Sequence, residues 1–241
     1  MISNTRKNLA LVIALTLTAP LLAQAEGFYG TAQLGVSQQI NDSQAIGNNI
    51  AVDPDFPAEF DAGDGTVGGI GLGYVINQQF RVEARIAYRE SSFNETQFGT
   101  GARNGEEYRL NGEIKSTTLS IEGFYDFQNS TAFTPYIKAG LGMADNSYSA
   151  KLGGAGVAAF DAFDGQTDGF YDAYADDDST GLTWNLGFGG NYQLSDTTSI
   201  YAEYQYASFG DVQTGQDSFT DGFEIGNLSS NELSLGLRIH F

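Results

Sequence analysis

Charged side chains recur at every second position in parts of this chain, and that spacing indicates where chemistry could take place. The segment 80–90 carries four of them: Arg81, Glu83, Arg85 and Arg89. Residues two apart on a β-strand point to the same face, so these side chains would lie together. Other alternating segments add charges to the equivalent face: Glu122, Lys138, Glu203, Glu232 and Arg238. Because a buried charge without a partner is very costly, mixed signs on an enclosed face predict ion pairs.

The depth of these charged residues predicts which of them meet. Counting from the nearest short connection places five at a similar level: Arg85, Glu122, Lys138, Glu203 and Arg238. The expected pairs are Arg85–Glu122, Lys138–Glu122 and Glu203–Arg238. A narrow enclosure lined by such side chains has little free space, so we expect a salt-bridged plug. The alternative is a narrow, gated pathway for ions.

Acidic residues supply a second kind of candidate site. Asp176, Asp177 and Asp178 form the densest carboxylate group, and carboxylate oxygens are ligands that Ca²⁺ accepts. The glycine and the terminal glutamate of an EF-hand are missing, so these residues are weak candidates for binding calcium. Solvated negative charge is the simpler interpretation.

Few residues here are suited to catalysis. The only histidine is His240, and a nucleophilic hydrolase needs a histidine within reach of both a nucleophile and an orienting acid. Cysteine is absent, which removes thiol chemistry, disulfides and cysteine ligands for zinc. We therefore expect no enzyme activity and no cofactor. The net charge of −19 also argues against nucleic acid as a partner, because phosphate binding needs basic patches.

The elements that must position these side chains are β-strands long enough to cross a membrane. The last segment, 232–241, alternates apolar and polar residues, and about ten tilted residues cross a bilayer. Seven more segments alternate in the same way, at roughly 27–38, 66–76, 80–90, 113–127, 134–146, 180–194 and 199–208. An even number of such strands is the rule for bacterial barrels. The predicted fold is all-β, an eight-stranded antiparallel transmembrane up-and-down β-barrel.

The connections between these segments alternate between short and long. Short periplasmic turns are predicted at 77–79, 128–132 and 195–198, and long extracellular loops at 39–65, 91–112, 147–179 and 209–229. The third long loop has a weaker alternation at 155–161 and a possible partner for it at 170–175. We interpret these as a strand extension or a loose hairpin outside the membrane. A ten-stranded barrel is the alternative.

The first 25 residues have the features of a signal peptide. Arg6 and Lys7 precede the apolar stretch 9–22, and Ala23-Gln24-Ala25 matches the small-residue cleavage pattern. We therefore divide the chain into a signal peptide at 1–25 and an outer-membrane β-barrel domain at 26–241. This organisation predicts export to the outer membrane of a Gram-negative bacterium. A retained anchor helix is the alternative.

With these features the chain resembles the small outer-membrane β-barrel superfamily, which includes the OmpA transmembrane domain, OmpX and the opacity-type proteins. The resemblance covers residues 26–241 and rests on the signal peptide, the eight alternating segments, the loop asymmetry and the aromatic end of the last strand. In that family such a terminal aromatic is a recognition signal for the barrel-assembly machinery, and Phe241 matches it. The resemblance also implies a charge network inside the barrel.

These features together predict an integral outer-membrane protein with a salt-bridged, closed lumen and long acidic extracellular loops. Its expected role is structural, or an interaction at the cell surface. The expected partners are outer-membrane lipid and lipopolysaccharide, the barrel-assembly machinery, and divalent cations at the acidic loops, together with a surface partner that the sequence does not identify. A small porin-like channel for ions or small solutes is the alternative function.

Overall fold

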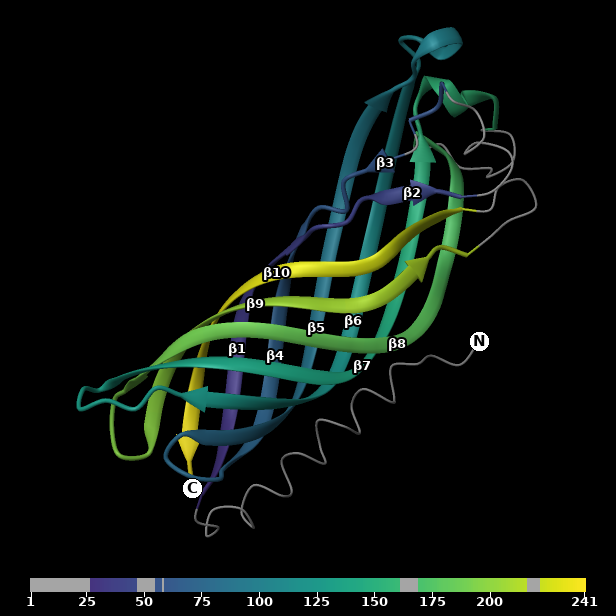
Figure 1. Ribbon diagram of the computed structural model, residues 1–241. Helices are drawn as coiled ribbons and strands as arrows, with labels where there is room; N and C mark the ends of the chain where they lie inside the picture. The colour runs from purple at the N-terminus through teal and green to yellow at the C-terminus, as the bar shows by residue number, and fades with distance from the viewer. Residues whose placement is uncertain (1–26, 47–54, 58, 161–168, 216–221) are drawn as a thin grey trace.

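Eight long antiparallel strands form a closed ring in this protein (Figure 1). The computed structural model describes residues 27–46, 55–57, 59–160, 169–215 and 222–241, so the predicted signal peptide lies outside it. Each strand pairs with its neighbours in chain order, and a ladder between β1 and β10 closes the ring. The strands are β1 (Phe28–Gln39), β4 (Asp64–Val75), β5 (Phe80–Phe98), β6 (Glu107–Asp126), β7 (Phe133–Gly153), β8 (Phe170–Gln193), β9 (Thr198–Gln213) and β10 (Phe223–His240). The predicted fold class is confirmed.

Short turns join the strands at the end of the barrel where the C-terminus lies (Figure 1). Asn77 shapes the first turn, because its side-chain oxygen accepts the backbone N–H groups of Gln79 and Phe80, both at 2.9 Å. Asn129 accepts the N–H of Thr131 at 2.8 Å in the second turn. Such side-chain acceptors satisfy backbone donors where the chain reverses. The strand ends predicted on this side agree closely with the structure.

At the opposite end the strands continue well beyond their predicted bounds. Four strand ends show this: Phe98 of β5, Glu107 of β6, Gly153 of β7 and Phe170 of β8. The segments 91–112, 147–179 and 209–229, which were expected to be loops, are therefore largely strand. The barrel projects as a folded extension past the part that faces lipid.

The polarity of the two strand faces is exchanged where the strands leave the lipid-facing zone, although the same alternate positions point inward throughout. In the lower part of β6, Leu119 and Ile121 point outward and are 59% and 58% exposed. In its upper part, Tyr108, Leu110 and Ile114 point inward and are buried. Hydrocarbon faces outward toward lipid below, whereas above that zone it gathers inside because it is removed from water there. The pattern of outward-facing apolar residues therefore ends at the edge of the lipid-facing zone.

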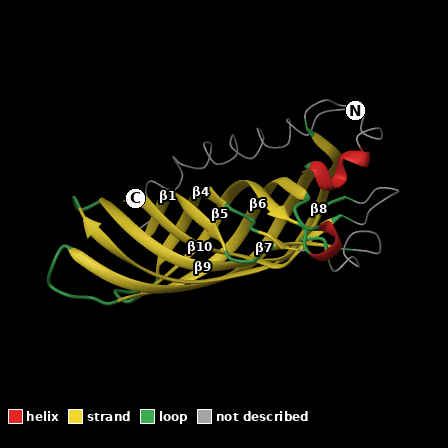
Figure 2. Ribbon diagram, turned by 90° about the horizontal axis from the view of Figure 1, so that it is seen from above, coloured by secondary structure: helices red, strands yellow, loops and turns green. Residues whose placement is uncertain are grey.

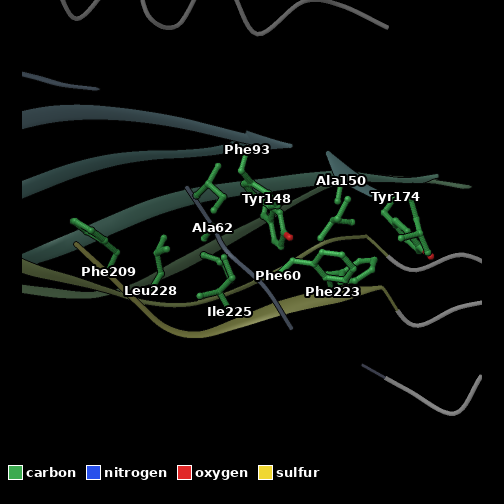
Figure 3. Close-up of a cluster of buried hydrophobic side chains, with 14 of the residues drawn as sticks. Phe60, Ala62, Phe93, Tyr148, Ala150, Tyr174, Phe209, Phe223, Ile225 and Leu228 are labelled. Atoms are coloured by element: carbon green, nitrogen blue, oxygen red, sulfur yellow. The ribbon is translucent and has the colours of Figure 1, made fainter. Parts of the chain in front are cut away.

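An apolar core fills the ring inside this extension (Figure 3). The first long connection contributes two short strands, β2 (Ser43–Ala45) and β3 (Glu59–Phe60), and β2 pairs with both β10 and β3. This pairing carries Phe60 into the core, where its ring centroid lies 6.0 Å from that of Phe223. Burying a phenylalanine side chain fully stabilises a fold by about 1.5–3 kcal/mol. The first connection is thus part of the folded core.

The third long connection differs in part from its predicted form. Residues Ala155–Phe160 form a short 3-10 helix, so a hairpin strand at this position is wrong. Residues 170–175 belong to β8 and pair with β7, which confirms the strand extension. This helix and a second 3-10 turn, Gly101–Arg103, lie at the end of the barrel opposite the C-terminus (Figure 2). Among the described residues, no helix is both long enough and apolar enough to cross a membrane.

Candidate functional site

The inward faces of the strands bring together all nine charged residues that the alternation singled out. Each of them is only 1–6% exposed. They are Arg81, Glu83, Arg85, Arg89, Glu122, Lys138, Glu203, Glu232 and Arg238. Because Arg81, Arg85 and Arg89 follow one another along β5, the contacts around them lie at successive levels of the lumen, which we call the lower, central and upper groups.

The central group is built around Arg85 of β5 and Lys138 of β7. Arg85 forms ion pairs with Glu83 at 2.9 Å, Glu122 at 3.4 Å and Glu203 at 2.9 Å. Lys138 contacts two of the same carboxylates, Glu122 at 3.1 Å and Glu203 at 2.7 Å. Three carboxylates therefore share two cations. If any one of these carboxylates is lost, both cations still have a partner.

Neutral groups add hydrogen bonds to the central group. The hydroxyl of Thr31 donates to Glu83 at 2.9 Å, and the hydroxyl of Tyr136 donates to Glu203 at 3.0 Å. Gly71 leaves the space that Glu83 occupies, because a Cβ at position 71 would lie 2.2 Å from a carboxylate oxygen of Glu83. Hydrogen bonds of this kind satisfy part of the remaining capacity of the buried carboxylates and so lower the cost of burying them.

The upper group is a single ion pair between Arg89 and Glu232. Arg89 Nη2 donates to one carboxylate oxygen at 3.1 Å, and Nε donates to the other. Gln205 and Ser230 also donate to Glu232, at 2.6 and 2.9 Å. The Arg89 guanidinium carbon lies 4.7 Å from the centroid of the Phe209 ring, which belongs to the apolar core above. The charged lumen and the apolar core are therefore in direct contact.

The lower group joins Arg81 to Asp126, which is not among the nine predicted lumen charges. Arg81 Nε lies 3.1 Å from Asp126, the last residue of β6. Its guanidinium carbon also lies 3.6 Å from the ring centroid of Phe124 and 4.8 Å from that of Tyr136. Asp126 lies four residues beyond Glu122 in β6 and therefore on the same face of the strand. The alternation in the sequence would have identified it as an inward-facing charge.

The predicted Glu203–Arg238 pair is wrong. Glu203 lies opposite Ser234 in the ladder between β9 and β10, whereas Arg238 lies opposite Ser199. Arg238 is therefore four residues, about 13 Å, nearer the short-turn end than the position opposite Glu203. Tilted barrel strands are staggered, so counting from their turns does not give equal heights. Arg238 instead lies over aromatic rings, with its guanidinium carbon 5.1 Å from the centroid of Tyr29.

The last two residues lie at the short-turn mouth of the barrel. The ring of His240 lies 5.5 Å from that of Tyr29. The backbone N–H of Phe241 donates to the carbonyl oxygen of Phe28 at 3.1 Å, which ties the final residue to the first strand. The role of Phe241 in assembly stays a prediction.

Only part of the acidic group at 176–178 lies among the described side chains. No three His, Cys, Asp or Glu side chains among the described residues are grouped closely enough to hold an ion. Asp177 accepts a hydrogen bond from Gln213 at 3.3 Å, Asp178 is exposed, and the side chain of Asp176 lies outside the described set. Calcium binding by these three residues stays a prediction.

The first and second long connections are held against the strand extension. Asp55 accepts the N–H of Ala102 through its side chain at 2.9 Å and that of Thr100 through its carbonyl oxygen at 2.8 Å. Ser43 and Tyr148 share a hydrogen bond of 2.6 Å. Burial raises the pKa of the Tyr148 phenol, so the hydroxyl stays protonated. The projecting end is therefore a packed structure with fixed contacts.

The known proteins to which this chain is similar are outer-membrane proteins. The model of the outer membrane protein beta-barrel domain matches residues 9–241. Outer membrane protein PagN of Salmonella typhimurium is 26% identical over 245 residues, covering 96% of this chain and 95% of PagN. The crystal structure of OprG from Pseudomonas aeruginosa superposes with a TM-score of 0.51 at 15% identity, covering 89% of this chain and 97% of OprG. A major outer membrane protein from Thermus thermophilus gives a TM-score of 0.50 at 12% identity, covering 90% of this chain and all of that one.

Proposed function

Because this chain belongs to the outer membrane protein beta-barrel domain family, we propose that it is a non-catalytic anchor whose closed barrel presents a rigid surface outside the cell. Its location in the outer membrane follows from the family. The outward face is suited to lipid, since Leu34, Leu141 and Leu235 are 75%, 63% and 69% exposed.

Two barriers in series support a closed lumen. The first is the charged network, where Arg85 alone bridges carboxylates from three strands, Glu83, Glu122 and Glu203. The second is the apolar core above it, in which Phe60 and Phe223 are each 1% exposed. An ion would have to pass a dry, aromatic constriction as well as the ion pairs, and each step carries a large desolvation cost. This succession of two unlike barriers is the observation that carries the proposal.

The surface role is supported by the shape of the projecting end. Strands β5 to β10 continue above the lipid-facing zone, and the first connection is packed into their core. A partner would meet side chains whose backbone is already ordered, which lowers the entropy lost on binding. We also propose that lipid and lipopolysaccharide surround the barrel, and that divalent cations bind its acidic loops. Export by the segment 1–25 and recognition of Phe241 by the assembly machinery complete the proposal.

Planar-bilayer conductance of the refolded barrel tests the closed lumen. Wild-type protein should show no steady current. Because the two barriers are in series, Glu122→Ala, which removes one carboxylate from the charged network, should stay closed, and so should Phe60→Ser, which polarises the apolar core. The double variant should conduct. Asn111→Ala, on the exposed outer face of β6, is the matched control and should behave as wild type.

A steady current in the wild-type protein would favour the porin-like channel. Conduction by either single variant at the level of the double variant would show that only one barrier exists. Each variant is also checked for the gel mobility of the folded barrel, so that a leak caused by misfolding is recognised.

A further inference from the structure

A cavity of about 720 Å³ opens at the short-turn mouth of the barrel, below the lower group. It is enclosed by the ring of strands and lined mainly by polar side chains, among them Arg81, Asp126, Asn191, Arg238 and His240. In the proposed orientation this mouth faces the periplasm. The cavity is separated from lipid by the barrel wall, so any occupant enters from the aqueous side.

Arg238 is a buried cation whose charge lacks a direct counterion. It is 6% exposed, and among the described residues no carboxylate lies within ion-pair distance of it. Its guanidinium carbon lies 5.1 Å from the ring centroid of Tyr29 and 5.8 Å from that of Tyr201. Its Nε–H is buried without a hydrogen-bond acceptor. Aromatic rings attract the cation, but they do not satisfy its N–H groups.

Arg81 adds a second guanidinium beside the same ring. Its guanidinium carbon lies 5.8 Å from the Tyr29 centroid, and Asp126 neutralises its charge at 3.1 Å. Even so, its Nη2 is buried without an acceptor. Two cations therefore approach one aromatic ring with a single carboxylate between them. Around this ring the two guanidinium groups exceed the nearby carboxylates by one charge, and both keep unused N–H donors.

The nearby carboxylates do not remove this excess. Asp196 and Phe241, whose α-carboxylate ends the given chain, also line the cavity, but both residues are exposed and therefore well solvated. Glu83 is committed to Arg85 at 2.9 Å and to Thr31 at 2.9 Å, although one of its oxygens has no hydrogen-bond donor. A shift of Arg238 onto that oxygen is the rival arrangement, and the experiment below separates the two.

We propose that the cavity is a binding site for a small oxyanion from the periplasm, of the phosphate class, held by Arg238 and Arg81. Guanidinium groups bind such anions through paired N–H donors, and these bonds are strong when the site is shielded from water. Asn191 contributes a buried side-chain oxygen without a donor, which suits the P–OH group of hydrogen phosphate or a hydroxyl of a larger phosphate. This site goes beyond the proposed anchoring function and does not depend on it.

The test is a titration of the intact barrel with inorganic phosphate in a phosphate-free, non-ionic detergent, followed through the Nε–H signals of ¹⁵N-labelled arginine. One signal should shift saturably with phosphate, and that signal should be missing from Arg238→Gln. Phosphate affinity measured from the phosphorus resonance should fall about 10- to 100-fold in Arg238→Gln, the equivalent of one lost charge-assisted hydrogen bond. Arg238→Lys should fall between the two, because it keeps the charge without the paired donors.

Arg109→Gln, on the half-buried outer side of β6 at the opposite end of the barrel, is the matched control and should leave the response unchanged. Several results would overturn the site. The first is an Arg238 signal that does not change with phosphate, as expected if Arg238 pairs with Glu83. The second is an equal shift with chloride at the same ionic strength, and the third is an equal loss of phosphate affinity in Arg109→Gln. A shift that appears only when phosphatidylglycerol is added to the micelle would assign the phosphate to a lipid headgroup and contradict a soluble ligand.

Discussion

Replacing Glu232 with alanine should destabilise the barrel more than replacing Glu122, although Glu122 contacts two cations and Glu232 contacts one. Glu232 is the carboxylate that pairs with Arg89, and it also accepts hydrogen bonds from Gln205 and Ser230. Its removal leaves a guanidinium that is 6% exposed without a counterion. Breaking a buried pair from one side costs about 3–5 kcal/mol.

Glu122 lies in a group that can tolerate its loss. After Glu122→Ala, Arg85 still contacts Glu203 at 2.9 Å, and Lys138 still contacts Glu203 at 2.7 Å. Three carboxylates around two cations become two, so repulsion between carboxylates decreases. The remaining cost is mainly the lost hydrogen bonds to charged groups, about 1.5–3 kcal/mol. The two variants should therefore differ by about 2 kcal/mol.

Urea unfolding in lipid vesicles measures this difference, and the single tryptophan, Trp184, reports it through its fluorescence. Glu232→Gln should recover part of the loss because an amide oxygen still accepts hydrogen bonds. The double replacement Arg89→Leu with Glu232→Leu should be nearly neutral, since a well-packed apolar pair often replaces a buried ion pair without loss. If Glu122→Ala costs as much as Glu232→Ala, the sharing of cations in the central group is not what stabilises it.

Three further predictions concern the extension, the topology and the last residue. Leu110→Ala should cost about 2–5 kcal/mol in the same urea assay because it leaves a cavity in the apolar core, and a neutral result would mean that the extension is not packed. In intact cells, cysteine at the exposed Asp178 should react with an impermeant maleimide and cysteine at Ser130 should not. The reverse pattern would mean that the barrel has the opposite orientation in the membrane. Deletion of Phe241 should lower the amount of folded barrel in outer-membrane fractions. Unchanged levels would contradict a role of Phe241 in assembly.

The lipid-facing part of the barrel could be read from the chain because its signal is local. A strand that crosses a bilayer must place hydrocarbon outward at every second residue, as Leu233, Leu235 and Leu237 do, and no distant residue is needed to see it. The same parity placed the charged residues on the inward face, and the short connections marked the turns. Strand number, ring closure and inward charges followed from these local patterns.

The extension above the lipid-facing zone could not be read in the same way. There, Tyr108, Leu110 and Ile114 of β6 lie inside and polar residues lie outside, so the alternation is reversed with respect to the lower half of the same strand. The surroundings of a strand change from lipid to water at a height that no local sequence pattern indicates. Only the tertiary structure shows that the first connection returns to cover this core with Phe60.

Partners across the lumen also depended on tertiary structure. Parity alone places Glu203 and Arg238 on the inward face, but their heights depend on the stagger between tilted strands, a property of the closed ring as a whole. The ladder register separates them by four residues, gives Glu203 to Arg85 and Lys138, and leaves Arg238 beside Tyr29 at the mouth. The sequence by itself determined which charges are enclosed, and the geometry of ring closure decided which of them meet.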